Sequence, residues 1–331
     1  AASVAAALLL AGCAGFPTTA EQVGQATPAA PELEIQSWRT EQGAKVMFVP
    51  SPALPMLDVR LVMDAGSARD GDQPGVAALT SALLGEGAEG LSVDDIARGF
   101  EDRGARFSTG SYQDMGVISL RTLSRPRWRD DAVDLLARVI GTPTFPEDAL
   151  ERIRTSALQG LKMEKQVPGP QVNKAFQRTL FGEHPYGHPQ SGTLESLPGI
   201  ERDDLVAFHQ RYYAAGNAVI ALVGDVSREQ AEAIAEQLSE ALPRGDAAPE
   251  LARAERLKER VTEHVDFPSN QTHILIGNQA TWRGNPDHVP LYVGNYILGG
   301  GGFASLLTQK VREEKGYVYG VSSFFKPMAA G

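Results

Sequence analysis

The sequence has little of what several protein classes require. It contains one cysteine among 331 residues, which excludes intrachain disulfides and cysteine-based zinc sites. No internal apolar run approaches the roughly 20 residues of a membrane-spanning helix, so a polytopic membrane protein is excluded. Basic residues number 31 against 41 acidic ones, and with a net charge of -10 no nucleic-acid partner is expected. What is present, 42% hydrophobic residues, indicates a globular chain with room for about two domains.

The single cysteine, Cys13, follows the apolar run AASVAAALLLAG. Small residues directly before a cysteine resemble a bacterial lipobox, in which the thiol is diacylated and the preceding residues are removed. Residues 1–12 are then a signal-peptide remnant, because an initiator Met and a basic start are missing. Residues 13–32, rich in Ala, Thr, Gln and Pro, form a lipidated flexible tether. This predicts a periplasm-facing lipoprotein of the bacterial cell envelope, bound to the membrane through its lipid anchor only; the alternative is an ordinary signal peptide with an incidental cysteine.

Residues 33–242 have the pattern of one domain that mixes strands and helices. A helix is expected at 74–84, because its apolar residues recur at helical spacing between a proline and a glycine. The alternating segment 104–123 predicts a β-hairpin. Further strands are expected at 44–49, 57–63 and 217–223, and further helices from Ser92 and at 130–140, 146–166, 170–180, 202–213 and 228–242.

After residue 242 the order of elements begins again. Residues 243–254 lack a core pattern and are interpreted as a linker. Thr272–Gly277 then resembles the strand at 57–63, and Val289–Leu298 resembles the helix at 74–84. Because these pairs keep a nearly constant offset, we predict an internal duplication. The expected fold is α+β, with two duplicated domains, each an antiparallel-rich sheet covered by helices; the second, 255–331, is expected to be incomplete because it stops inside its own hairpin.

Four strings carry a resemblance to a known family. They are DAGSARDGDQPGVAALTSALLGEGAEG, FGEHPYGHPQSGT, YYAAGNAVIALVGDV and LGGGGFASLLTQKVREEKGYVYGVSS. Their content and order resemble the M16 (pitrilysin- and insulinase-like) metallopeptidases, particularly the bacterial short-subunit branch. In that family, proteolysis depends on an inverted zinc motif, His-x-x-Glu-His, on the first helix.

The family's zinc site is degenerate in this chain. The resemblance places the two histidine ligands at Ala78 and Ala82, the catalytic base at Ser81 and the third ligand near Gln159. A methyl group has no lone pair, and a neutral amide is a poor substitute for a carboxylate. We therefore expect no metal and no cofactor in this chain, which would be inactive as a peptidase alone.

Two residues near the end of the sequence match functional positions of the family. In the family an arginine and a tyrosine on this segment face the zinc, hold the substrate backbone and stabilise the oxyanion; the matching residues are Arg312 and Tyr319. A guanidinium can donate to peptide carbonyls, and a phenol can donate to the developing oxyanion. The residues by themselves leave another interpretation equally open, in which Arg312 complements a helix C-terminus and Tyr319 packs in a strand.

The family's glycine-rich loop corresponds to Gly299, Gly300, Gly301 and Gly302, where a peptide backbone could approach closely. This run is no nucleotide loop, because no Gly-Lys-Ser/Thr follows it. His184 and His188 are four residues apart, but an intervening proline and glycine argue against a helical metal site. The favoured interpretation is a loop whose His and Tyr tie the neighbouring backbone.

The resemblance predicts that this chain is the zinc-less subunit of a heterodimeric M16-like peptidase. It would supply substrate-binding and oxyanion-stabilising residues, while a zinc-bearing M16-like subunit supplies the metal for hydrolysis of a peptide substrate. The alternative is a non-catalytic envelope lipoprotein that binds peptides or scaffolds an assembly. An autonomous hydrolase of another type has little support, because the chain has no G-x-S-x-G motif and its cysteine lies in the lipobox.

Overall fold

The computed structural model describes residues 33–281 and 285–330. The chain divides into two units, residues 1–35 and residues 36–331, and the architecture below belongs to the second. Cys13, the signal remnant and the tether lie outside the described residues. In the described ranges, no helix has both the length and the apolar composition needed to cross a membrane.

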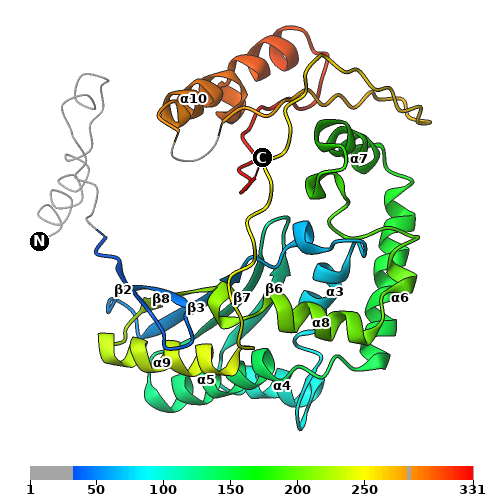
Figure 1. The fold of residues 1–331 in the computed structure, drawn as a ribbon. Helices are drawn as coiled ribbons and strands as arrows, with labels where there is room; N and C mark the ends of the chain where they lie inside the picture. Colours follow the sequence, from blue (N-terminus) through cyan, green and yellow to red (C-terminus); the bar gives the residue numbers. More distant parts are fainter. Residues whose placement is uncertain (1–32, 282–284, 331) are drawn as a thin grey trace, which may run out of the picture. The chain divides into compact units, whose positions relative to one another are not determined.

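A six-stranded sheet is the centre of the first domain (Figure 1). The strand order is β1-β2-β8-β3-β7-β6, and every neighbouring pair is antiparallel except β2 and β8. A separate two-stranded ribbon is formed by β4 (Gly87–Ala88) and β5 (Leu91–Ser92). The strands of the large sheet are β1 (Gln36–Arg39), β2 (Lys45–Pro50), β3 (Met56–Met63), β6 (Arg106–Ser111), β7 (Gly116–Leu123) and β8 (Ala218–Gly224).

Strand β3 shows how the sequence produces the core. Its apolar residues alternate with polar ones, so one side of the strand is buried while Arg60 on the other is exposed. Val59 lies opposite Leu120 of β7 and Leu222 of β8, which makes a continuous apolar row across three strands. Complete burial of each such side chain contributes about 1.5–3 kcal/mol, so this row holds the centre of the sheet together.

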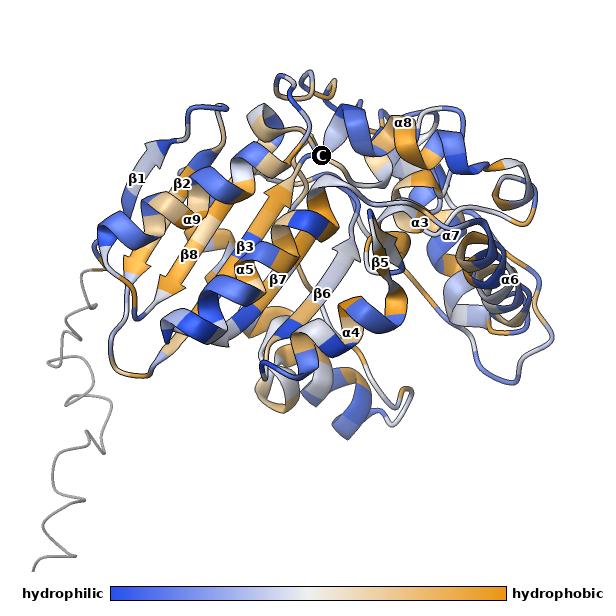
Figure 2. Cartoon of the chain, turned by 90° about the horizontal axis from the view of Figure 1, so that it is seen from below, coloured by the Kyte–Doolittle hydropathy of each residue, from blue (hydrophilic) through white to orange (hydrophobic). Residues whose placement is uncertain are grey.

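Helices cover the sheet. In Figure 2, α5 and α9 lie across the strands, and they contact β7 and β2 respectively, while α4 contacts β6. Helix α3 contacts β6 and β7 and also packs against α6 and α8. The helices of this domain are α3 (Val76–Leu83), α4 (Val93–Glu101), α5 (Pro126–Gly141), α6 (Glu147–Glu164), α7 (Pro168–Phe181), α8 (Arg202–Tyr212) and α9 (Arg228–Ala241), with short turns η1 (Ser67–Arg69), η2 (Pro185–Gly187), η3 (Leu197–Gly199) and η4 (Ala215–Asn217).

The α+β class predicted from the sequence is confirmed, and the expected elements of residues 33–242 are present within a few residues of their predicted ends. Strand β1 and the β4–β5 ribbon were not predicted. Both are short, and two to four residues are too few for an alternating pattern to stand out.

The second half differs from the expected duplicate. No strand forms in the described residues after Gly224, and the predicted strand Thr272–Gly277 leaves Ile276 93% exposed. A strand requires a neighbour that pairs with its backbone groups, and no described segment pairs with this one. The predicted helix Val289–Leu298 forms as α10 (His288–Asn295) followed by a wider turn, η5 (Tyr296–Gly300). Two further short turns follow, η6 (Gly302–Ala304) and η7 (Thr308–Glu314).

His209 fastens α8 to α5 inside the core. Its Nε2 lies 2.8 Å from the Ile140 carbonyl oxygen, and its ring stacks on Tyr213 and meets Phe145 edge-on. Burial lowers the pKa of His209 to about 4, so the ring is neutral at pH 7 and its Nε2–H donates to Ile140.

This histidine makes stability depend on pH. Below its ordinary pKa of 6.5, His209 takes up a proton in the unfolded chain but stays neutral in the folded one, so acid favours unfolding. Between about pH 6.5 and pH 4 we expect the wild type to lose about 3 kcal/mol of unfolding free energy relative to His209→Gln. Urea unfolding of both proteins across this range measures the difference.

Asp70 titrates in an overlapping range with the opposite sign. Burial raises its pKa from 3.8 to about 7, so the folded chain binds this proton first and acid stabilises it. Both proteins carry Asp70, and the comparison between them therefore isolates His209. Parallel stability curves for wild type and His209→Gln would contradict the assignment.

Candidate functional site

Helix α3, which carries three of the four degenerate metal positions, starts at a polar cap. The Asp70 carboxylate accepts hydrogen bonds from the backbone N–H groups of Gly75 (2.7 Å) and Ala77 (2.9 Å). Gly75 has φ +105°, and a Cβ atom there would lie 2.6 Å from the Leu197 side chain. Only glycine is tolerated at such a position, so the start of α3 is tightly defined.

The residues present at the family's zinc positions do not fit a zinc ion. Ala78 is half-buried on α3, Ala82 is exposed one turn later, and Gln159 is exposed on the neighbouring helix α6. Ser81 is buried, and its carbonyl accepts a hydrogen bond from the Thr109 hydroxyl (2.7 Å). Two methyl groups and one amide provide no adequate ligand set. Across residues 33–281 and 285–330, no three His, Cys, Asp or Glu side chains gather in a way that could hold a metal.

Arg312 and Tyr319 lie together. The Arg312 guanidinium carbon is 5.4 Å from the centre of the Tyr319 ring and 4.9 Å from that of Phe303. Arg312 is in the last turn of η7, and Tyr319 is 90% exposed. The prediction of a strand at Tyr319 is wrong, because the residue lies in an irregular segment without a pairing partner. The structure thus places a guanidinium against the ring of an exposed tyrosine. Arg312 Nε also lies 3.4 Å from a carboxylate oxygen of Glu313.

The glycine run Gly299–Gly302 is closely packed against its own chain. A Cβ atom on Gly299 would lie 2.5 Å from the Ser323 hydroxyl oxygen, and one on Gly301 would lie 2.8 Å from the Tyr296 carbonyl oxygen. The last glycine of the run has φ +62°, which disfavours other residues. These glycines therefore have an internal packing reason, and their expected contact with a peptide substrate stays a prediction.

The loop after α7 ties together neighbouring backbone, as expected for its His and Tyr. His184 Nδ1 accepts a hydrogen bond from the Tyr186 backbone N–H (3.2 Å), and its Nε2 lies 2.8 Å from the Ala252 carbonyl oxygen. Because Nδ1 is an acceptor, Nε2 carries the proton and donates to Ala252. His184 is therefore occupied by the backbone on both ring nitrogens.

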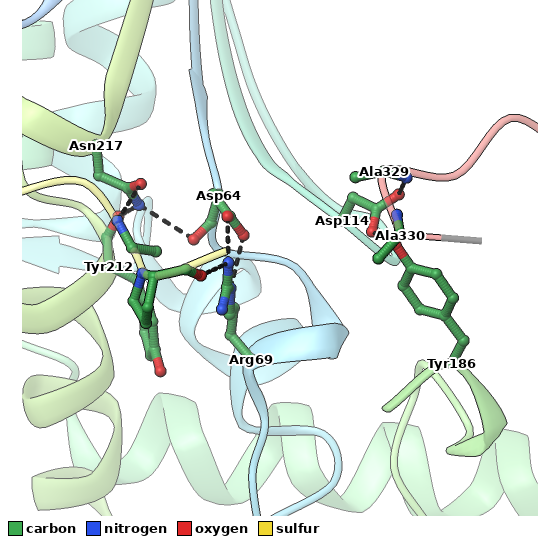
Figure 3. A network of polar contacts seen from close by, with 10 residues as sticks. Asp64, Arg69, Asp114, Tyr186, Tyr212, Asn217, Ala329 and Ala330 are labelled. Atoms are coloured by element: carbon green, nitrogen blue, oxygen red, sulfur yellow. Dashed lines mark hydrogen bonds and ion pairs between the residues drawn. The ribbon is translucent and has the colours of Figure 1, made fainter. Parts of the chain in front are cut away.

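A second polar cluster, shown in Figure 3, was missed by the sequence analysis. Arg69 is bonded to both carboxylate oxygens of Asp64 and donates to the Pro249 carbonyl oxygen (2.7 Å). Asn217 donates to the Asp64 carbonyl oxygen (3.0 Å) and accepts from the Ala248 N–H (3.0 Å). These contacts hold Ala248 and Pro249 against the residues that follow strand β3 and precede strand β8. No local pattern reveals them, since Asp64 and Asn217 are 153 positions apart.

The helix-covered six-stranded sheet and the segments that follow it have the fold of M16 peptidase-like proteins. The chain belongs to peptidase family M16. The family model described as "Insulinase (Peptidase family M16)" matches residues 45–194, and the model "Peptidase M16 inactive domain" matches residues 199–329.

Solved and curated relatives agree with this membership. The crystal structure of a peptidase M16 inactive domain from Pseudomonas fluorescens is 46% identical, with a TM-score of 0.85, over 89% of this chain and 72% of that one. An "Uncharacterized zinc protease" of Mycobacterium leprae is 28% identical over 85% of this chain and 63% of its own length. A "Non-peptidase homolog YmxG" of Helicobacter pylori is 25% identical over 83% of this chain and 63% of its own length. The chain thus spans less than two thirds of these two curated relatives.

Proposed function

We propose that this chain is the zinc-less subunit of a heterodimeric M16-like peptidase. A zinc-bearing M16-like subunit would supply the metal. This chain would supply Arg312, which binds the peptide backbone, and Tyr319, whose hydroxyl donates to the oxygen of the scissile carbonyl as charge develops there. The Gly299–Gly302 run would allow the peptide to approach closely.

The observation that carries the proposal is the pairing of Arg312 with an exposed Tyr319. A tyrosine with 90% of its surface exposed makes little contribution to the core, so packing alone gives little reason for its place. The guanidinium carbon lies 5.4 Å from the centre of its ring, a cation–π contact that favours this position of the ring. The alanines at positions 78 and 82 support the assignment of the metal to a partner.

Reconstitution tests the proposal directly. The full chain is mixed with a zinc-bearing M16-like protein, one whose sequence carries His-x-x-Glu-His, and cleavage of a fluorogenic peptide library is followed. We expect cleavage by the mixture and none by either protein alone. If the zinc-bearing protein alone cleaved as fast as the mixture, the proposed role of this chain would be refuted.

A second candidate function is a non-catalytic envelope lipoprotein that binds peptides or scaffolds an assembly. It is supported by the names of the similar proteins, one an "inactive domain" and another a "Non-peptidase homolog". The same assay separates the two functions, because the second predicts peptide binding without cleavage by any pair.

We further propose that the protein is anchored in the cell envelope through Cys13. Acylation of this thiol would keep the complete protein in the membrane fraction, because the two acyl chains of a diacylglycerol together give stable membrane anchoring. We expect Cys13→Ser to move the protein into the soluble periplasmic fraction, as followed by fractionation and immunoblotting. Identical fractionation of wild type and Cys13→Ser would contradict this prediction.

A further inference from the structure

Asp114 and Tyr186 form a prearranged pair of hydrogen-bond acceptors. Asp114 lies in the turn between β6 and β7, and Tyr186 lies in η2, 72 positions later. The Tyr186 ring is completely buried, meets Phe181 edge-on, and donates its hydroxyl proton to Asp114 Oδ1. With that proton committed, the second carboxylate oxygen and the phenol lone pair are both available to accept.

The acceptors hold the backbone of an extended segment (Figure 3). The Ala329 N–H donates to Asp114 Oδ2 (3.0 Å), and the Ala330 N–H donates to the Tyr186 hydroxyl oxygen (2.8 Å). On the other side, the Ala330 carbonyl oxygen accepts from the Ala254 N–H (2.9 Å). Two successive N–H groups are therefore bound by side chains rather than by a helix or a sheet. In this mode of binding, hydrogen bonds to the backbone of the segment give affinity, and the fit of its side chains gives specificity.

The side chains around the segment select for size. Ala330 is only 5% exposed and packs in a small apolar cluster with Ala68, Leu180 and Phe181. Met328 packs against the same cluster, whereas Ala329 between them is exposed. This alternation is that of an extended chain, with one small residue buried and one long apolar residue two positions before it.

We propose that Asp114 and Tyr186 form a binding site for the backbone of an extended peptide with that pattern, and that the chain's own Met328–Ala330 segment occupies it. A covalently attached segment has a high effective concentration, so it excludes a free peptide until it is displaced. The inference goes beyond the proposed function, because it requires neither a partner subunit nor cleavage.

Two matched substitutions in the full chain test the proposal. Ala330→Gln brings a larger, polar side chain into the buried cluster and should release the segment, whereas Ala329→Gln places the same group at an exposed position. The probe is a fluorescent, C-terminally amidated peptide, Phe-Lys-Pro-Met-Ala-Ala, followed by anisotropy. We expect Ala330→Gln to bind it at least about tenfold more tightly than wild type or Ala329→Gln, because the competing segment is gone.

The two acceptors are tested in Ala330→Gln, the variant in which the segment is expected to be released. Adding Tyr186→Phe to Ala330→Gln keeps the ring but removes the acceptor oxygen. This should weaken binding of the peptide by about three- to tenfold. A peptide methylated on the nitrogens of both alanines has the same side chains without the donors, and it should not bind. Equal binding of the methylated peptide, or no gain in Ala330→Gln, would overturn the proposal.

Hydrogen exchange provides a test that needs no opened variant. In the wild type, we expect the Ala329 and Ala330 amides to exchange more slowly than other amides in the irregular segment after η7, and Tyr186→Phe should remove the protection at Ala330. Unchanged exchange in Tyr186→Phe, with circular dichroism and melting like the wild type, would also overturn the proposal. Because none of these measurements involves cleavage, failure here leaves the result of the reconstitution unaffected.

Discussion

In the reconstituted pair, Tyr319→Phe is expected to lower kcat by about 10²–10³, the loss typical of removing one donor to a developing oxyanion. The ring remains, so its contact with the Arg312 guanidinium is kept and only the hydroxyl is lost. Because Tyr319 is 90% exposed, the substitution should leave the melting temperature unchanged. The measurement is single-turnover and steady-state cleavage of one peptide, beside a thermal melt of this chain.

Tyr317→Phe is the matched control. Tyr317 is 77% exposed, lies on the same irregular segment, and loses the same atom, but it makes no ring contact with Arg312 among the described residues. It should leave kcat unchanged. Arg312→Ala should raise KM as well as lower kcat, because a backbone-binding group acts in the ground state too. Wild-type turnover in Tyr319→Phe would remove this residue from the mechanism.

The second large effect concerns zinc. The purified wild-type chain is expected to contain no stoichiometric zinc, because methyl groups stand at Ala78 and Ala82 and an amide at Gln159. The combined change Ala78→His, Ala82→His and Gln159→Glu should restore about one zinc per chain, since α3 and α6 pack together in the native fold. Elemental analysis after gel filtration measures the content.

The two histidine substitutions without Gln159→Glu are the control. Removing a residue that hydrogen-bonds to a metal ligand already lowers metal affinity by about 10–100-fold. Removing a ligand itself should therefore lower zinc affinity by more than roughly 100-fold. A competition titration with a chelating dye compares the two variants. One tightly held zinc in the wild-type chain would show that another set of residues binds it.

Much of the first domain could be predicted from local pattern. The alternation in β3 is a signal between residues two positions apart, and the buried residues of the strand match it. Helix α3 lies between Pro74 and Gly85, the two residues that predicted its ends. The same signals failed at Thr272–Gly277. An apolar alternating segment becomes a strand only when another segment completes its hydrogen bonds, and this partner is not contained in the local sequence.

What the sequence by itself determined is chemistry that does not depend on placement. Alanine cannot bind zinc wherever α3 lies, and one cysteine cannot form an intrachain disulfide. The tertiary structure alone decided which groups meet. Tyr186 donates a hydrogen bond to Asp114, which lies 72 positions away in the sequence. Arg312 contacts the ring of Tyr319 although the expected strand does not form. The reason is physical: local propensity acts between residues near in the chain, whereas such pairings depend on the sum of packing contacts over the whole fold.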